Sequence, residues 1–401
     1  MGETGHPAML DTVNPVSSVP AWSRVLPLTA WLRIVYLCNY AAVGSIQPYL
    51  TLHYRELGYS GFQVGLLAAT LPLRSALIAP LGGLIADRFR VHRAMLRGAL
   101  LLAALGAMLM SQTTSFYPNL MLVLLVSLSS APLASLIDSY GVTVGEQEGV
   151  SYGRFRVWGS FGYAAASWLV GQSMATELST LFLIAYATAL TLALGATLGL
   201  PSLRLRSARY AGRGMTTIMR NGALLVLLLT TFLVSVASGI MYNYLAIYLG
   251  SLGAGTGLVG LAFSLASMSQ WPVIIFSTWF FRRWSSDQIL SLAIGIYVLR
   301  FVLYSIVRIP EYILLVQLLH GLSYGLFLMA SVTWAYQLVD REMAATALGL
   351  LASMSSGFGM MAGALLGGIL FDRTEGPAIF YLVSGAKWGI GGSAAYSLRS
   401  C

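Results

Sequence analysis

The chain has 401 residues, of which 57% are hydrophobic and only 9% are charged, and its formal net charge is +9. Soluble globular domains carry roughly 25% charged residues, so this composition excludes a soluble domain and predicts an integral membrane protein. The basic residues lie in short loops between apolar runs, so the positive charge does not indicate nucleic-acid binding.

The amino-terminal stretch, residues 1–25, is polar and contains Pro and Ser. It lacks the charged start, short apolar run and cleavage site of a signal peptide, so we predict a disordered cytoplasmic tail. Cys38 lies inside the first apolar run and Cys401 is the last residue, so no disulfide framework is predicted.

Runs of about 20 apolar residues, long enough to cross a bilayer as helices, follow one another along the chain. They lie near 26–50, 62–86, 94–112, 118–140, 155–175, 179–200, 223–249, 257–281, 288–307, 311–335 and 344–371, with a weak twelfth at 377–396 that contains Lys387 and a Gly-rich stretch. We therefore predict an all-α membrane protein with two pseudo-symmetric six-helix bundles, residues 26–200 and 223–401, the last helix being weak or truncated. An Arg-rich linker, 201–222, joins them.

An internal repeat supports the two bundles, because residues 49–66 and 244–261 match at a spacing of 195. The matched pairs are Tyr49/Tyr244, Leu50/Leu245, Leu57/Leu252, Gly58/Gly253, Val64/Val259, Gly65/Gly260 and Leu66/Leu261. Further matches at a spacing of 196 pair Ser135 with Ser331, Tyr140 with Tyr336, Leu169 with Leu365 and Gly171 with Gly367. Repeats of the same hand in an apolar chain are typical of a large class of transporters.

Arg residues are unevenly divided between the two sides of the predicted bundles. The side of the amino terminus carries fourteen: Arg88, Arg90, Arg93, Arg97, Arg154, Arg156, Arg204, Arg206, Arg209, Arg213, Arg220, Arg282, Arg283 and Arg341. The other side carries three: Arg55, Arg308 and Arg373. This asymmetry predicts that the amino terminus and the linker are cytoplasmic.

Four ionisable residues lie inside the predicted spans: Arg74, Asp138, Arg300 and His320. Because an unpaired charge in hydrocarbon costs at least ~2.5 kcal/mol, such residues indicate a cavity or a pathway. At about 1.5 Å per residue, Arg300 lies about 18 Å from one side and His320 about 13 Å from the other. They and Arg74 therefore meet near the midplane, where guanidinium groups suit an anionic or hydroxyl-rich solute. Pairing with helix-end carbonyls is the alternative.

Asp138 is predicted near the cytoplasmic end of the fourth span, and Arg156 begins the fifth at a comparable level. Such a pair could bind solute and hold a transferable proton, or it could be a structural ion pair; the sequence leaves both open. Aromatic side chains could stack against a solute ring or simply pack in the bilayer: Tyr40, Tyr49, Trp158, Tyr242, Tyr244, Trp271, Tyr324 and Trp334.

The loop between the second and third spans runs Gly83-Leu84-Ile85-Ala86-Asp87-Arg88-Phe89-Arg90-Val91-His92-Arg93. It resembles the loop signature of the major facilitator superfamily, in which Gly83, Asp87, Arg88 and Arg93 would form the conformational loop motif. The glycine that usually follows the Asp by three residues is Arg90 here, and the position 195 after Asp87 is Arg282, so the acidic element is not duplicated.

A narrower resemblance begins at Tyr152-Gly153-Arg154-Phe155-Arg156-Val157-Trp158-Gly159-Ser160 and continues at Gln317-Leu318-Leu319-His320-Gly321. These stretches resemble the fifth and tenth helices of the lactose, nucleoside and phenylpropionate permease group of proton symporters. The resemblance implies that Arg156 and Asp138 bind solute and that His320 belongs to a proton-coupling network. Arg300 matches a functional Arg on the ninth helix of that group. Where relatives carry acids on the eighth and tenth helices, this chain has Gln270 and Ser323 or a neutral neighbour, so coupling would rest on Asp138 and His320.

We therefore predict a secondary transporter that takes up a small organic solute, a sugar, nucleoside or aromatic acid, with protons by alternating access. Arg74, Arg156, Arg300, Asp138 and Trp158 are the predicted solute contacts. Two alternatives remain: a proton-driven exporter of amphiphilic compounds, or a decayed paralogue that does not transport.

The remaining expectations concern partners. No phosphate-binding loop, nucleophile–base pair or metal-ligand cluster is present in the sequence, so we expect no enzymatic activity, no cofactor and no metal ion. The expected partners are a small-molecule solute, protons and the lipid bilayer, with no nucleic acid. We expect a monomer in the cell inner membrane, with its amino terminus cytoplasmic.

Overall fold

A computed structural model describes residues 26–73, 91–174, 180–201, 220–340 and 343–374, and every regular element in these ranges is helical. The first half contains α1 Leu28–Ile46, α2 Leu50–Glu56, α3 Gly61–Leu73, α5 His92–Met110, α6 Phe116–Ser130, α7 Leu133–Glu148, α8 Tyr152–Ser173 and α9 Leu181–Thr197. The second half contains α11 Gly222–Ser251, α12 Thr256–Met268, α13 Gln270–Ile275, α14 Ser277–Arg283, α15 Ser286–Ile306, α16 Pro310–His320, π-helix η3 Gly321–Gly325, α17 Leu326–Gln337, α18 Ala344–Ala352, π-helix η4 Ser353–Gly359 and α19 Met360–Arg373.

Length and composition make seven of the described helical stretches able to cross a membrane. They are His92–Met110, Phe116–Glu148, Gly222–Ser251, Thr256–Ile275, Ser286–Ile306, Pro310–Gln337 and Thr346–Arg373. Gly61–Leu73 and Leu181–Thr197 are shorter apolar helices. The all-α membrane fold predicted from the sequence is confirmed, and the weak span at 377–396 lies outside the described residues.

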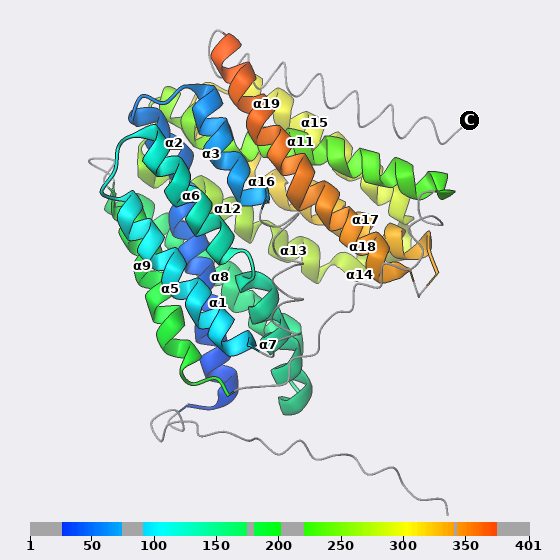
Figure 1. The fold of residues 1–401 in the computed structure, drawn as a ribbon. Coiled ribbons are helices and arrows are strands. Elements are labelled where there is room, and N and C mark those ends of the chain that lie inside the picture. Colours follow the sequence, from blue (N-terminus) through cyan, green and yellow to red (C-terminus); the bar gives the residue numbers. More distant parts are fainter. Residues whose placement is uncertain (1–25, 74–90, 175–179, 202–219, 341–342, 375–401) are drawn as a thin grey trace, which may run out of the picture.

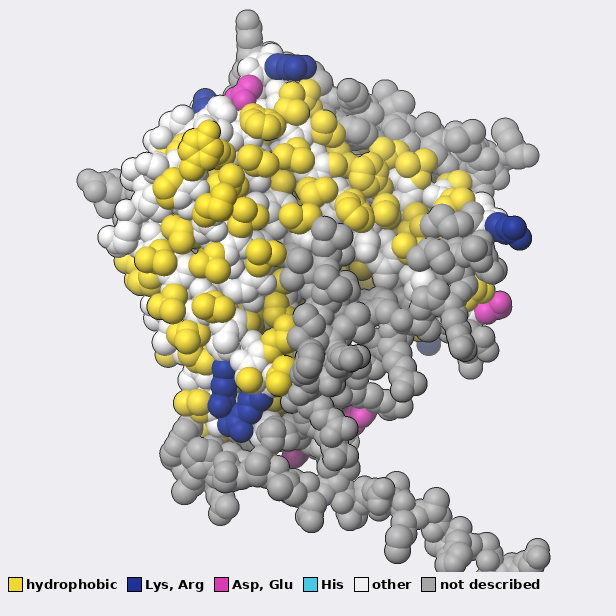
Figure 2. Space-filling model, in the orientation of Figure 1, with side chains coloured by type: hydrophobic (Ala, Val, Ile, Leu, Met, Phe, Trp, Pro, Cys, Tyr) yellow, Lys and Arg dark blue, Asp and Glu magenta, His cyan; other side chains and the backbone are white. Residues whose placement is uncertain are grey.

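The helices α1–α9 form one set and α11–α19 form another. The two sets pack against each other at the top of Figure 1. We call the side where α9 ends and α11 begins the linker side, and the side where α2 leads into α3 the far side. Hydrophobic side chains cover the flank of the first set, with Arg side chains at both ends of that flank (Figure 2). This distribution fits a surface that faces lipid, flanked by water.

The repeat is visible in the backbone at the ends of α2 and α11. Gly58 and Gly253 both have positive φ, +82° and +85°, which a residue with a Cβ rarely adopts. In each turn the next amide, that of Tyr59 or Ala254, donates to a carbonyl five residues earlier. The Leu-Gly pair therefore ends both helices with the same turn.

On the far side, two helix pairs join the halves: α3 with α19, and α8 with α12. The hydroxyl of Tyr244 donates to the carbonyl oxygens of Gly61 and Ala364 at 3.2 and 3.1 Å. The hydroxyl of Tyr49 donates to the Ser167 carbonyl of α8 within the first half, and it lies beside Gly260 of α12. Gly65 and Gly260, the glycines of the repeat, face Ala364 and Ser167 with no room for a Cβ. Each half thus supplies one tyrosine and one glycine to these contacts.

Among the described residues, a carboxylate reinforces the α3–α19 pair and none reinforces the α8–α12 pair. Asp372, near the end of α19, accepts hydrogen bonds from the backbone N–H groups of Gly61 and Phe62 at 2.7 and 2.8 Å. These are free N–H groups of the first turn of α3, where a negative charge is stabilising. On the other pair, Thr256 at the start of α12 donates its hydroxyl to the Gly171 carbonyl at 3.0 Å.

Candidate functional site

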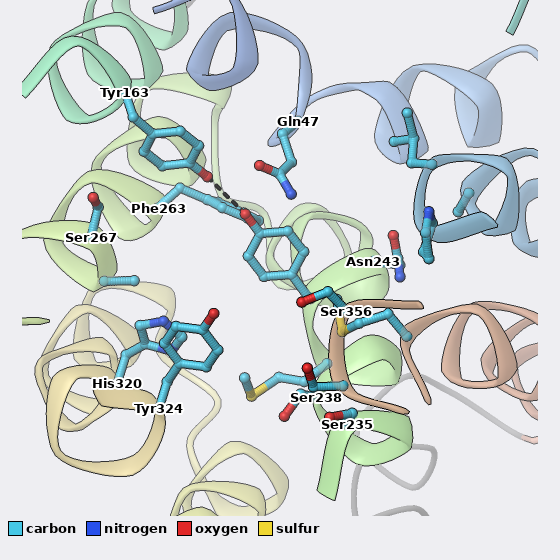
Figure 3. Close-up of a pocket in the computed structure, with 18 of the residues that line it drawn as sticks. Gln47, Tyr163, Ser235, Ser238, Asn243, Phe263, Ser267, His320, Tyr324 and Ser356 are labelled. Carbon is cyan, nitrogen blue, oxygen red and sulfur yellow. Dashed lines mark hydrogen bonds between the residues drawn. The ribbon is translucent and has the colours of Figure 1, made fainter. Parts of the chain in front are cut away.

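A cavity of about 410 Å³ lies between the two halves (Figure 3). Its walls come from α1, α2, α3 and α8 on one side and from most helices of the second half on the other. Eight aromatic side chains line it: Tyr40, Tyr54, Tyr163, Tyr242, Phe263, Tyr297, Tyr324 and Phe327. Its neutral polar lining consists of Gln47, Thr51, Ser160, Ser235, Ser238, Asn243, Ser267, Gln270, Ser355 and Ser356. His320 also lines it. Such a wall suits a ring-bearing solute with several hydrogen-bonding groups.

Two hydroxyls bridge the halves inside the cavity. Tyr163 of α8 and Tyr242 of α11 lie 3.0 Å apart, oxygen to oxygen, and Figure 3 shows the hydrogen bond between them. The backbone of Tyr163 is held against Gly44 of α1, where a Cβ would not fit. The ring of Tyr242 meets the Phe263 ring at 72° with centroids 5.5 Å apart. Both hydroxyls are therefore placed by close packing.

Arg300 lies behind the cavity wall, fully buried on α15. One terminal nitrogen donates to Ser323 Oγ at 2.9 Å and lies 3.2 Å from His320 Nδ1. The other donates to Tyr304 and Gln317 at 3.0 Å each. The predicted meeting of Arg300 and His320 near one depth is seen, but Arg300 itself does not line the described cavity.

His320, the last residue of α16, and Tyr324, in the π-helix η3 that follows, both line the cavity. The imidazole of His320 stacks on the Tyr324 ring, with centroids 5.3 Å apart and planes 7° from parallel. The Gly321 amide donates to Ser269 Oγ at 2.8 Å, and a Cβ at Gly321 would clash with the Ser269 carbonyl group. A π-helical turn often marks a functional site, because it rotates side chains away from ordinary helical positions.

Asp138 and Arg156 come together at the edge of the cavity, from α7 and α8. Asp138 Oδ1 lies 3.8 Å from an Arg156 nitrogen and accepts a hydrogen bond from the Tyr36 hydroxyl at 2.8 Å. The guanidinium carbon of Arg156 lies 4.7 Å from the centre of the Tyr40 ring, and Tyr40 lines the cavity. Arg156 keeps 46% of its side chain exposed, so this ion pair is accessible.

The other predicted site residues lie elsewhere. Trp158 is 41% exposed and packs on Phe161, which is also exposed, so the structure does not bring it to the cavity. On α8 it is two residues from Ser160, which faces the cavity, and a helix turns about 200° over two residues. Arg93 donates to the Leu198 carbonyl at 3.5 Å, beyond the end of α9. The predicted residues Arg74, Gly83, Asp87 and Arg88 lie outside the described residues.

Several residues of the site were not singled out from the sequence. Gln317 and Tyr304 hold Arg300, and Gln47, Asn243 and Phe263 line the cavity. The repeat spacing could have found some of them, since Phe263 follows Ala68 by 195 residues and both line the cavity.

The comparisons with known proteins agree with this geometry. The model of the MFS_1 like family, within the major facilitator superfamily, matches residues 29–383. The chain belongs to this family. The maltose permease of Geobacillus stearothermophilus is 25% identical over 353 residues, covering 88% of this chain and 90% of the relative. A probable 3-phenylpropionic acid transporter of Escherichia coli is 27% identical over 322 residues, covering 74% and 79%.

Among solved structures, the crystal structure of the nucleoside transporter NupG superposes on this member of the family with a TM-score of 0.85. The match covers 94% of this chain and 100% of that one at 18% sequence identity. At this identity the likeness shows a shared fold. The family and the fold together make this chain a multi-pass membrane protein of a transporter family.

Proposed function

We propose that this protein is a secondary active transporter that takes up a sugar, nucleoside or aromatic acid together with protons by alternating access. The observation that carries the proposal is the aromatic and polar cavity between two halves that are joined on the far side. Relatives named for maltose, nucleosides and 3-phenylpropionic acid support this range of solutes.

The moving units are the two bundles, residues 26–200 and 223–401, joined by the linker 201–222. The excess of Arg on the linker side supports a cytoplasmic amino terminus in the inner membrane. The far side then faces outward and is closed in this conformation. Rocking of the bundles would separate α3 from α19 and α8 from α12, and would open the cavity to the outside.

Asp138 and His320 exchange the proton in this mechanism, and Arg156 binds the solute from the cavity edge. Arg300 acts through His320, because it is buried behind the imidazole. A second proton on His320 would remove the lone pair that faces Arg300, so protonation would rearrange the cavity wall. Solute and proton affinities would thereby be coupled. Arg74 remains a candidate solute contact.

Transport by purified protein in sealed liposomes tests the proposal, with labelled maltose, a nucleoside and 3-phenylpropionate as solutes. We expect accumulation of at least one of them when the interior is alkaline, and collapse of that accumulation by a protonophore. Equal uptake with and without a proton gradient would contradict proton coupling. Failure to move any of the three in either direction would contradict the assigned solute classes.

A further inference from the structure

The hydrogen-bond directions around Arg300 fix the proton position on His320. A guanidinium group has only donors, so His320 Nδ1 must accept from Arg300, and the proton of the neutral imidazole is on Nε2. His320 lines the cavity. The cavity wall therefore presents a donor at this point, with a permanent cation directly behind it.

Within the part of the chain that the structure describes, the charge of Arg300 has no carboxylate partner. Its four acceptors, on His320, Ser323, Tyr304 and Gln317, are all neutral, and its buried Nε has no acceptor within the described residues. A buried cation held only by neutral groups keeps its field, because nearby water does not screen it. His320, which contacts Arg300, lines the cavity, so the field of Arg300 reaches the cavity across this imidazole.

Arg156, the second Arg at the cavity, does not change the net charge around it. Arg156 is paired with Asp138 at 3.8 Å, so the two contribute no net charge. Among the described residues, the charged groups around the cavity wall are Arg156, Asp138 and Arg300, and they sum to +1. One monovalent anion in the cavity would neutralise this charge. Arg74, the further candidate solute contact, would add positive charge and so also favour an anion.

We infer that the solute is a monocarboxylate attached to an aromatic ring. Its carboxylate accepts the Nε2–H of His320 in front of Arg300, and its ring lies among the aromatic side chains, beginning at Tyr324. A carboxylate is preferred to a hydroxyl here because only a full negative charge gains from the field of Arg300. This inference rests on the proposed transport function and selects one of its three solute classes.

Matched acids and amides test the inference, because they share shape and differ in charge. The full chain in nanodiscs at pH 7 is titrated calorimetrically with 3-phenylpropionate and 3-phenylpropanamide, and with benzoate and benzamide. We expect at least one acid to bind about tenfold or more tightly than its amide. Amides that bind as well as or better than their acids overturn the inference. Binding of maltose or a nucleoside in that case leaves the transport proposal standing, whereas no binding in the whole panel overturns both.

The variant Arg300→Gln tests whether the charge of Arg300 causes the preference for acids over amides. Gln keeps a donor toward His320 but removes the charge, so the acid-to-amide ratio should fall to about one while amide affinity stays within about twofold. Retained amide binding shows that the variant is folded, and a ratio that stays near the parent value overturns the inference. If Arg300→Gln does not fold, His320→Leu replaces it and should lose the same preference. Ser305→Ala, an uncharged change on the same helix as Arg300 that does not line the cavity, is the matched control and should leave the ratio unaltered.

Discussion

Twelve residues that line the cavity form six pairs spaced 195 apart, one member from each half. The pairs are Tyr40/Ser235, Gln47/Tyr242, Ala68/Phe263, Leu71/Ala266, Pro72/Ser267 and Ser160/Ser355. The two halves therefore place the same positions of the repeat at the cavity, although only the last pair keeps the same residue. The far-side contacts keep both position and residue, as Tyr49/Tyr244 and Gly65/Gly260.

The charged groups of the two halves differ more. The first half holds Asp138 and Arg156 as an accessible ion pair at the cavity edge. The second half holds Arg300 fully buried, with neutral partners and His320 in front. The comparison teaches that closure of the far side is symmetric and that the chemistry of the cavity is not.

The largest effect is expected when a larger side chain prevents the two halves from closing on the far side. In Gly65→Val or Gly260→Val, the new side chain meets the carbonyl of Ala364 or Ser167, and a backbone group cannot move aside. Overpacking costs ~1–3 kcal/mol, so liposome uptake should fall roughly 10- to 100-fold in both variants. Gly98→Val is the matched control, because nothing lies near its Cβ position. Normal uptake in either contact variant would contradict the described closure.

Because the charged groups of the two halves differ, a change in the first half should uncouple solute accumulation from the proton gradient. Asp138→Asn leaves Arg156 without its counter-charge, so we expect proton-driven accumulation to fall about tenfold or more while exchange of solute across the membrane continues. Glu311→Gln, an exposed acid at the start of α16, is the control. Accumulation and exchange that fall together would show that the ion pair is structural.

The two tyrosines of the repeat share a position but not a hydrogen-bond partner. Tyr244→Phe removes a hydroxyl that donates across the halves to Gly61, whereas Tyr49→Phe removes one that donates to Ser167 within the first half, beside Gly260. A buried hydrogen bond contributes about 1 kcal/mol, so Tyr244→Phe should shift the far-side equilibrium toward opening about fivefold, and Tyr49→Phe should shift it less. Labelling of a far-side cysteine reports this shift. A shift as large in Tyr49→Phe as in Tyr244→Phe would contradict the described contacts.

The smallest effect concerns Asp372, a far-side contact that is not repeated in the described part of the other half. Asp372→Asn keeps one oxygen acceptor at the start of α3 but loses the charge, which should cost ~0.5–1 kcal/mol and favour opening about two- to fivefold. Thr256→Val, at the start of α12, is the matching change in the other pair. An opening that increases more in Thr256→Val than in Asp372→Asn would contradict the assigned importance of the carboxylate.

The depth of a side chain in the membrane could be predicted from the sequence, but the direction in which the side chain points could not. The helical rise of about 1.5 Å per residue was enough to bring Arg300 and His320 to one level. It did not show that Arg300 lies behind the imidazole, because the rotation of a helix is set by packing and by the π-helical turn at Gly321–Gly325. Trp158 shows the same limit: in lipid, an apolar periodicity does not separate the side facing lipid from the side facing the cavity.

The central claim is that solute in the cavity controls opening of the far side. It is tested most directly by an electron-spin distance between labels at Gln112→Cys and Ser251→Cys, with Cys38 and Cys401 replaced. These two positions lie on the far side in different halves. The account predicts two distance populations whose ratio changes when a transported solute and protons are added together. A single distance that stays constant at saturating solute would contradict it.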